Sequence, residues 1–221
     1  LVVRHMPEAD TSPVPQRNPR RTPQKRDASL PVLEKLAELY PHLFGAVFLP
    51  LKRGIFQDLL ASHPEVFETE SLKAALSTHT RSTRYLNSVA SGQMRHDLQG
   101  QAVEAMAPEH IHHALVEVFR RRQNRTEEDL KPRLLDRMLQ AWEESGLSPQ
   151  DYAERVRTRD ATASELLNTC MALASERSAK SEALLRAFTA SGKTVEEFAD
   201  MYGMDPEHTA QTLERARTQA A

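Results

Sequence analysis

The sequence has few of the residues that stabilise extracellular or membrane proteins. Cys170 is the single cysteine among 221 residues, which excludes a disulfide framework and a cysteine-based metal site and fits a reducing, cytoplasmic compartment. No apolar run is long enough for a membrane span, and no apolar leader opens the chain, so neither a span nor a signal peptide is expected. Only seven glycines and 5% aromatic residues are present, which favours a mainly helical protein rich in Ala, Leu, Glu and Arg.

Signals for catalysis are equally scarce. Residues 191–194 read SGKT, like the end of a phosphate-binding loop, but Ala187 stands where that loop needs its first glycine and a helix precedes it. His110, His112 and His113 are spaced so that they scatter around a helix, and no carboxylate or cysteine lies at a metal-ligand spacing from them. Because no catalytic arrangement of residues is recognisable, we expect a protein that is not an enzyme and that needs neither a metal nor a cofactor.

Charge is unevenly distributed along the chain, although the net charge is only −2. Residues 1–30 hold six Lys or Arg and three Asp or Glu, residues 31–125 hold eleven and ten, and residues 126–221 hold twelve and eighteen. A polyanion is therefore expected to bind the first half of the chain. The proline-rich residues 1–30 are predicted to be a disordered basic arm, either a solubilising tail or an auxiliary RNA contact.

Hydrophobic spacing predicts short helices and one β-hairpin in residues 31–125. Apolar residues recur at helical spacing, and Thr80 is a candidate N-cap for the helix that carries Tyr85. Alternation from Met94 to Ala105 around a Gln99-Gly100 turn predicts the hairpin. The expected fold class is mainly α with a small β-hairpin, and the helices are predicted within residues 30–41, 54–64, 68–80, 80–89 and 107–122.

The acidic region 126–221 contains an internal duplication. Residues 141–156 align with residues 187–202 without gaps at an offset of 46, and each copy reads as helix, glycine stop, Ser or Thr cap, second helix. The aligned aromatic residues lie where two helices pack together, so we interpret them as core residues. This predicts an all-α extension with a duplicated helix-turn-helix unit at about residues 133–160 and 179–206.

The middle of the chain carries a set of cations with one aromatic residue among them. Arginine clamps phosphates and an aromatic ring stacks on a base, a combination found on single-stranded nucleic acid, although a solvated helix face has a similar composition. Lys52 and Arg53 precede Gly54 at a predicted helix start, where backbone amides and the helix dipole favour phosphate. The other residues of the set are Lys73, Arg81, Arg84, Tyr85 and Arg95, and Arg120 to Arg122 follow at a helix end where they suit either the dipole or a phosphate.

Three motifs in order resemble those of the ProQ/FinO family of RNA chaperones, over residues 31–122. PLKRGIFQDL at 50–59 resembles the family signature Pro-Leu-Lys-x-Gly-Ile-x-x-Asp-Leu. THTRSTRYL at 78–86 contains a match to Thr-x-Ser-x-Arg-Tyr-Leu, and GQMRHDLQG at 92–100 resembles the Gly-x-x-Arg-x-Asp-Leu-x-Gly hairpin. The resemblance implies a compact, mainly helical α/β domain whose positively charged concave face holds the 3′ end of a structured RNA.

The resemblance also implies which side chains contact RNA. Positions where the family often has further cations are here Leu49, Ser77 and Ala90, so a narrower RNA repertoire or weaker binding is expected. The family positions matched are Lys52, Lys73, Arg84, Tyr85 and Arg95, and the full set of candidate RNA-binding residues adds Arg53, Arg81, Ser82, Arg121 and Arg122.

The sequence therefore predicts an RNA chaperone that binds terminator-like 3′ stem-loops of small RNAs and mRNAs. One alternative is a DNA-binding regulator, because residues 194–213 resemble a helix-turn-helix, although Glu207 and Glu214 are unfavourable in a recognition helix. Another alternative is a helical adaptor that binds no nucleic acid. A protein partner for the acidic helices is compatible with an RNA chaperone and with an adaptor. Because residues 126–221 are net negative, their charge alone predicts tighter RNA binding when they are deleted.

Overall fold

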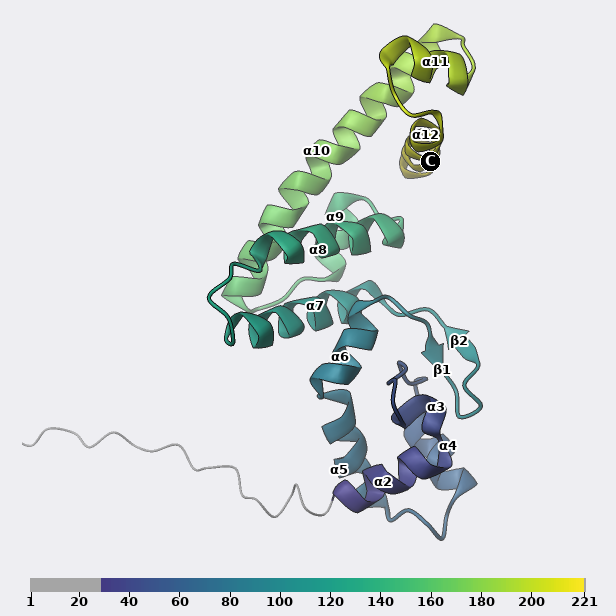
Figure 1. Ribbon diagram of the computed structural model, residues 1–221, viewed down its shortest axis with the longest axis vertical. Helices are drawn as coiled ribbons and strands as arrows, with labels where there is room; N and C mark the ends of the chain where they lie inside the picture. The colour runs from purple at the N-terminus through teal and green to yellow at the C-terminus, as the bar shows by residue number, and fades with distance from the viewer. Residues whose placement is uncertain (1–28, 221) are drawn as a thin grey trace, which may run out of the picture.

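The computed structural model describes residues 29–220 and is mainly helical, with one small antiparallel sheet (Figure 1). The expected fold class is thereby confirmed. The basic arm predicted at the N-terminus lies outside the described residues, apart from its last two positions. No helix in the described part of the chain is long and apolar enough to cross a membrane. The elements are α2 (Leu30–Leu39), α3 (Pro41–Phe44), α4 (Ile55–Ser62), α5 (Thr69–Thr80), α6 (Thr83–Ala90), β1 (Arg95–His96), β2 (Ala102–Glu104), α7 (Pro108–Gln123), α8 (Lys131–Ser145), α9 (Pro149–Arg155), α10 (Ala161–Ser191), α11 (Val195–Tyr202) and α12 (Pro206–Ala220).

The first half of the fold is built on apolar stripes of short helices. Leu36 of α2, Leu59 of α4 and Leu72 of α5 are completely buried in one core, which α6 and α7 complete. None of these helices is long enough to be stable alone, so their burial against one another supplies their stability. The connection between α3 and α4 runs across this core and carries the PLKRG stretch.

The hairpin fixes that connection in place. In β1 and β2, Arg95 pairs with Glu104, and Gly100 adopts a left-handed conformation with φ of 76° in the turn, as predicted. The N–H of His96 donates to the carbonyl of Pro50 at 2.7 Å, and the N–H of Lys52 donates to the carbonyl of His96 at 2.8 Å. The PLKRG stretch therefore lies beside β1 like a third, very short strand.

Two helix starts differ in how well the sequence predicts them. Gly54 has φ of 84° and is the N-cap of α4, which is the turn that its position suggests. The prediction that Thr80 caps the next helix is wrong, because Thr80 is the last residue of α5 and its hydroxyl donates to the carbonyl of Leu76. Ser82 is the N-cap of α6, and its hydroxyl accepts the N–H of Tyr85 at 3.1 Å.

The second half of the fold contains the duplicated helix-turn-helix unit that the sequence predicts. Gly146 and Gly192 both end a helix in the left-handed conformation, and Ser148 and Thr194 both cap the next helix. Helix α10 is continuous over 31 residues, and its last part is the first helix of the second copy. Its first part packs on α8 and α9 of the first copy, and its far end packs on α11 and α12 (Figure 1).

Three of the four aligned aromatic residues lie in the cores of the two copies, as the sequence indicates, whereas Phe188 is only half-buried and packs edge-on against Phe198 with ring centroids 5.3 Å apart. Trp142, Tyr152 and Phe198 are all fully buried or nearly so. Helix α8 also buries Leu134 and Met138 in a core that it shares with α7, so the two halves of the molecule are packed together.

Candidate nucleic-acid interface

A pocket of about 440 Å³ lies between α6, β1 and α7, and we call it the Tyr85 pocket. One wall is formed by Arg81, in the turn that precedes α6, and by Tyr85 and Val89, which lie four residues apart on one face of α6. The opposite wall is a stripe of polar residues on one face of α7, and Arg95 and Met106 complete the lining. The residues of the α7 stripe are His110, His113, Glu117 and Arg121.

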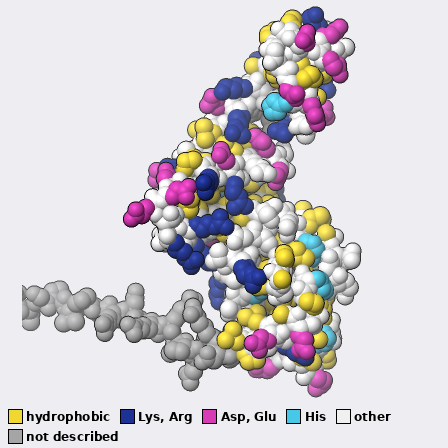
Figure 2. Space-filling view, in the orientation of Figure 1, with side chains coloured by type: hydrophobic (Ala, Val, Ile, Leu, Met, Phe, Trp, Pro, Cys, Tyr) yellow, Lys and Arg dark blue, Asp and Glu magenta, His cyan; other side chains and the backbone are white. Residues whose placement is uncertain are grey.

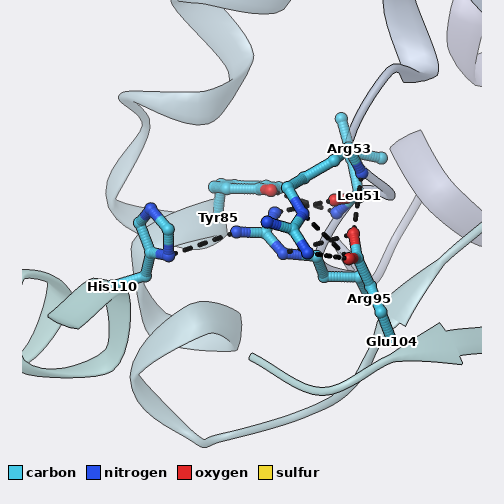
Figure 3. Close-up of polar contacts among 6 residues, drawn as sticks. All are labelled: Leu51, Arg53, Tyr85, Arg95, Glu104 and His110. Atoms are coloured by element: carbon cyan, nitrogen blue, oxygen red, sulfur yellow. Dashed lines mark hydrogen bonds and ion pairs between the residues drawn. The ribbon is translucent and has the colours of Figure 1, made fainter. Parts of the chain in front are cut away.

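The main role of Tyr85 is to stabilise the wall of the pocket, because little of its ring is exposed. Its side chain is only 6% exposed, and its hydroxyl accepts the backbone N–H of Leu51 at 3.0 Å (Figure 3). The ring also packs edge-on against His79, with centroids 5.2 Å apart. Burial raises the pKa of the phenol, so it stays protonated. A base can therefore contact only the small part of the ring that faces the pocket, in contrast to the open stacking platform that the sequence suggests.

Arg95 holds a fixed positive charge at the edge of the pocket. Its guanidinium donates to the carbonyl of Leu51 at 2.9 Å and lies 3.4 Å from Nδ1 of His110 (Figure 3). Glu104, its partner in the hairpin register, approaches its Nε to 3.7 Å. Because Tyr85 and Arg95 both bind the backbone of Leu51, the pocket and the PLKRG stretch form one rigid structure.

Lys52 and Arg53 are both paired with carboxylates, which the sequence does not reveal. Lys52 Nζ lies 2.8 Å from Asp58, whose hydrogen bond raises the pKa of the lysine. Arg53 binds Glu104 through its guanidinium at 2.8 Å and through its backbone N–H at 2.9 Å (Figure 3). These hydrogen bonds lower the pKa of Glu104, and the carboxylate is ionised at neutral pH. A phosphate at either cation must compete with the carboxylate already bound to it.

Arg81 and Arg121 approach each other where the end of α7 crosses the start of α6. Arg121 Nη1 donates to the carbonyl of Arg81 at 2.9 Å and to the hydroxyl of Thr83 at 3.1 Å, and its Nη2 pairs with Glu117 at 3.2 Å. The Arg81 side chain is exposed and forms no ion pair within residues 29–220. The free guanidinium of Arg81 is therefore available to an anion in the pocket.

Six sequence-predicted residues do not line this pocket, and two of them are Lys52 and Arg53 with their carboxylate partners. Lys73 is exposed on α5 without an ion pair in the described part of the chain, and Ser82 is engaged as the cap of α6. Arg84 donates to the carbonyl of Ala46 at 2.7 Å and covers the ring of Phe48 at 4.7 Å. Arg122 donates to the amide oxygen of Asn87 at 3.3 Å and lines a different groove. The structure thus brings Arg81, Tyr85, Arg95 and Arg121 together in one pocket. Lys52 and Arg53 follow Leu51, whose backbone binds Tyr85 and Arg95.

The histidines and carboxylates of the pocket are residues that the sequence reasoning did not place at an RNA site. His110 and His113 line the pocket, whereas His112 is buried on the other side of α7 with its pKa lowered by burial to about 4. Glu104 could have been found from the hairpin register, because it lies directly opposite Arg95. Within residues 29–220, no three His, Cys, Asp or Glu side chains gather closely enough to hold a metal ion.

Lys and Arg side chains also gather beyond the pocket. Figure 2 shows them over the end of α7 and the start of α8, and further over the α5–α6 part of the same face. Acidic side chains are more frequent towards α11 and α12 in this view. The basic part of the surface therefore extends from the first half of the fold into α8, beyond the segment that carries the three motifs.

Comparisons with known proteins agree with the motif resemblance. Residues 26–131 match the model of the ProQ/FINO family. An RNA chaperone ProQ from Idiomarina loihiensis is 42% identical over 97 residues, which cover 42% of this chain and 46% of that protein. An RNA chaperone ProQ from Aeromonas salmonicida is 42% identical over 96 residues, covering 41% and 45%. The matched segment thus spans less than half the length of these curated relatives.

One solved structure is similar to part of the chain. It is that of a FinO-like RNA chaperone from Neisseria meningitidis, with 28% sequence identity and a TM-score of 0.40, covering 46% of this chain and 82% of that one.

Proposed function

Residues 26–131 form a domain of the ProQ/FINO family, and from that premise we propose that the protein is an RNA chaperone. It binds the 3′ end of a stem-loop RNA of the intrinsic-terminator type in the Tyr85 pocket. Binding protects that end and modulates the pairing of the RNA with a second RNA. The relatives from Idiomarina loihiensis and Aeromonas salmonicida are RNA chaperones, which supports the proposal for the matched segment.

The observation that carries the proposal is the convergence of three guanidinium groups on one partly apolar pocket. Arg81 comes from the turn between α5 and α6, Arg95 from β1 and Arg121 from α7, and apolar side chains of α6 and the hairpin region lie between them. Guanidinium groups bind phosphate oxygens in a bidentate manner, and apolar surface suits a ribose or a base face. A terminal nucleotide with its phosphate matches this combination better than a free anion does.

The geometry also fits an RNA end better than the middle of a duplex. The major groove of A-form RNA is too narrow for side chains, so proteins recognise its shape, backbone and unpaired nucleotides. Arg95 and Arg121 are held by backbone carbonyls and carboxylates, which fixes them in position before RNA binds. A single-stranded tail can enter such a pocket, whereas a continuous helix cannot.

The α11–α12 pair favours RNA over the alternative of DNA recognition by a helix-turn-helix. Thr209, Leu213 and Ala216 of α12 are buried in the fold, and Glu207 and Glu214 are exposed. A recognition helix needs cations or amides facing the phosphates and bases. We therefore do not propose a DNA-binding function for this unit.

The test is a binding titration of a stem-loop RNA with a U-rich 3′ tail, over a series of salt concentrations. We expect a clear salt dependence, and a loss of affinity of about tenfold, or 1.4 kcal/mol, when the 3′ hydroxyl is blocked by phosphate. Arg81→Gln should weaken binding by a similar factor. Arg81 is preferable to Tyr85 for this test because its guanidinium supports no contact within the described fold, so the variant keeps its structure.

Arg186→Gln is the matched control for charge, since Arg186 is exposed on the distant part of α10 and its one ion pair within residues 29–220 is with Glu182. Duplex DNA serves as the competitor. Equal binding of blocked and unblocked RNA, or equal losses for Arg81→Gln and Arg186→Gln, would contradict the proposed end recognition. Chaperone activity is then measured as the rate of annealing of two complementary RNAs with and without the protein.

A further inference from the structure

A second cationic hollow lies outside the Tyr85 pocket, between the end of α7 and the start of α8. Its volume is about 350 Å³, and we call it the arginine groove. Four arginines and one carboxylate line it, above a floor of apolar residues. The charged residues and the one aromatic residue of the groove are Arg122, Arg125, Arg133, Arg137, Glu128 and Phe119.

Within residues 29–220, three of the four guanidinium groups have no carboxylate partner. Arg122 donates to the amide oxygen of Asn87, and Arg137 donates to the carbonyl of Ala90 at 2.9 Å. The Arg125 side chain forms no ion pair in the described part of the chain. Arg133 pairs with Glu128 at 3.1 Å, but both side chains are more than half exposed, so this pair is weak. The groove therefore keeps a strong positive charge that the fold does not neutralise.

The like charges of these arginines repel one another, which destabilises the folded protein when no anion is bound. Burial lowers the pKa of Arg137, and the nearby charge of Arg122 lowers it further. An anion that binds between them relieves this repulsion, as phosphate does in arginine-rich nucleic-acid sites. The arrangement is thus the one expected where a polyanion binds.

The groove is also shaped before any ligand binds. The side chain of Gln123 holds the α7–α8 connection from inside, donating to the carbonyl of Glu128 at 2.8 Å and accepting the N–H of Leu130 at 2.9 Å. Phe119 is half-buried in the floor and presents part of its ring to the groove. A fixed, cationic groove with an aromatic surface suits a nucleotide better than a mobile charged loop would.

Helices α6 and α7 connect the arginine groove to the Tyr85 pocket. Arg121 lines the pocket and its neighbour Arg122 lines the groove. Arg122 and Arg137 both reach α6, the helix that carries Tyr85. The continuous gathering of cations over α6, α7 and α8 in Figure 2 follows the same course. One extended polyanion can therefore contact both hollows.

We infer that the arginine groove binds backbone phosphates of the same RNA whose 3′ end occupies the Tyr85 pocket. The inference rests on the proposed function and extends the RNA-binding surface onto α8, most of which lies beyond residues 26–131. The pocket holds the end of the RNA, and the groove holds phosphates further from that end.

The test uses Arg125→Gln/Arg133→Gln, which removes two exposed side chains that support no contact within the core. With the stem-loop RNA, we expect about a tenfold loss of affinity at low salt and a salt-dependence slope reduced by about 1 for each arginine removed. Glu128→Gln should have the opposite effect, because it removes the carboxylate from the groove, and binding should become about two- to threefold tighter. Arg186→Gln/Arg217→Gln is the matched control at the far end of the molecule.

A short U-rich oligonucleotide without a stem provides the second arm, since it fits the Tyr85 pocket alone. Wild type and Arg125→Gln/Arg133→Gln should bind it with equal affinity. An unchanged salt slope with the stem-loop, or an equal loss with the short oligonucleotide, overturns the groove inference while the proposed function stands. Absence of stem-loop binding by the wild type instead overturns the proposed function, and the inference with it.

Discussion

The hydroxyl of Tyr85 has a structural role that its family motif does not reveal. It accepts the N–H of Leu51, a residue that is 3% exposed, so water cannot replace the bond if the hydroxyl is removed. Tyr85→Phe should therefore lower the free energy of unfolding by about 1–3 kcal/mol, the cost of a buried donor without a partner. Urea denaturation of both proteins measures this difference.

Tyr202→Phe is the control for the loss of a tyrosine hydroxyl. Tyr202 lies on α11 and is 60% exposed, and its hydroxyl forms no hydrogen bond within the described residues. Its replacement should change stability by less than about 0.5 kcal/mol. Equal effects of the two substitutions would show that the Leu51 contact contributes nothing.

Two buried histidines predict acid sensitivity. Burial lowers the pKa of His79 and of His112 to about 4. Because both are neutral in the folded state but bind protons near pH 6.5 when unfolded, the protein is most stable above pH 6.5 and loses stability as the pH falls toward 4. Each histidine should contribute about 1.4 kcal/mol of loss per pH unit in this window.

His112→Leu separates this effect from the titration of carboxylates. Neither ring nitrogen of His112 has a hydrogen-bond partner in the described structure, and the ring packs against Tyr152. The variant should therefore show about half the loss of stability between pH 6.5 and pH 5, as measured by urea midpoints. The exposed His208 of α12 is the control, and His208→Gln should keep the full loss; a pH dependence unchanged by His112→Leu would contradict the assignment.

At this scale the sequence predicts which cations exist but not which are free. Lys52 and Arg53 are prominent in the motif, yet Asp58 and Glu104 bind them. The Arg53–Glu104 pair joins residues 51 positions apart, so only the folded hairpin brings it together. The sequence gives no reason to prefer Arg81 to these two cations, but within the described residues Arg81 has no carboxylate partner.

The hairpin is the element whose geometry depends most on one glycine. Gly100 has φ of 76°, and a Cβ added there would lie 2.7 Å from the ring of His42, which binds the carbonyl of Leu98. Gly100→Ala should therefore cost more than the roughly 1–2 kcal/mol of the left-handed conformation, because the His42 contact must also move. Thermal unfolding measures the loss.

Gly146→Ala isolates the conformational part of that cost. Gly146 has φ of 67° at the end of α8, and nothing lies within 4 Å of an added Cβ. It should cost only this conformational part, roughly 1–2 kcal/mol. If Gly146→Ala proves as harmful as Gly100→Ala, the contact between the hairpin and His42 is not important for stability.

Helix boundaries show what local patterns can and cannot predict. The sequence predicts the hairpin turn and the two helix ends at glycine, because glycine adopts a positive φ at little cost and so marks these positions locally. The start of α6 was misplaced, because Thr80 and Ser82 are equally good caps in sequence and the preceding helix extends through Thr80. The continuity of α10 is also not evident from the sequence, since only its last part belongs to a copy of the repeat, while its first part packs on α8 and α9 of the other copy.

At the scale of the whole molecule, charge and packing give opposite expectations for the acidic region. Its net charge alone predicts that deletion of residues 126–221 tightens RNA binding. The structure leads us to expect weaker binding and lower stability, because α8 covers α7 and supplies Arg133 and Arg137 to the arginine groove. Each fully buried Leu or Met side chain lost with α8 costs about 1.5–3 kcal/mol.

A chain that ends after residue 125 should therefore have a lower melting temperature than a chain that ends after residue 191. The longer truncation retains α8, α9 and α10, so it should keep the RNA affinity of the full chain. Thermal unfolding and the stem-loop titration measure both quantities. Tighter binding and unchanged stability of the shorter chain would favour the charge argument over the packing argument.

The two ion pairs of Glu143 constrain how the length of α10 can change. This carboxylate on α8 binds Arg177 of α10 at 3.0 Å and Arg215 of α12 at 3.3 Å. One residue inserted between Arg177 and the end of α10 would rotate everything beyond it by about 100° and move it by about 1.5 Å. Arg215 would then face away from Glu143. Substitutions along the exposed side of α10 can accumulate freely, whereas single-residue insertions there change the helical phase and should be rejected during evolution.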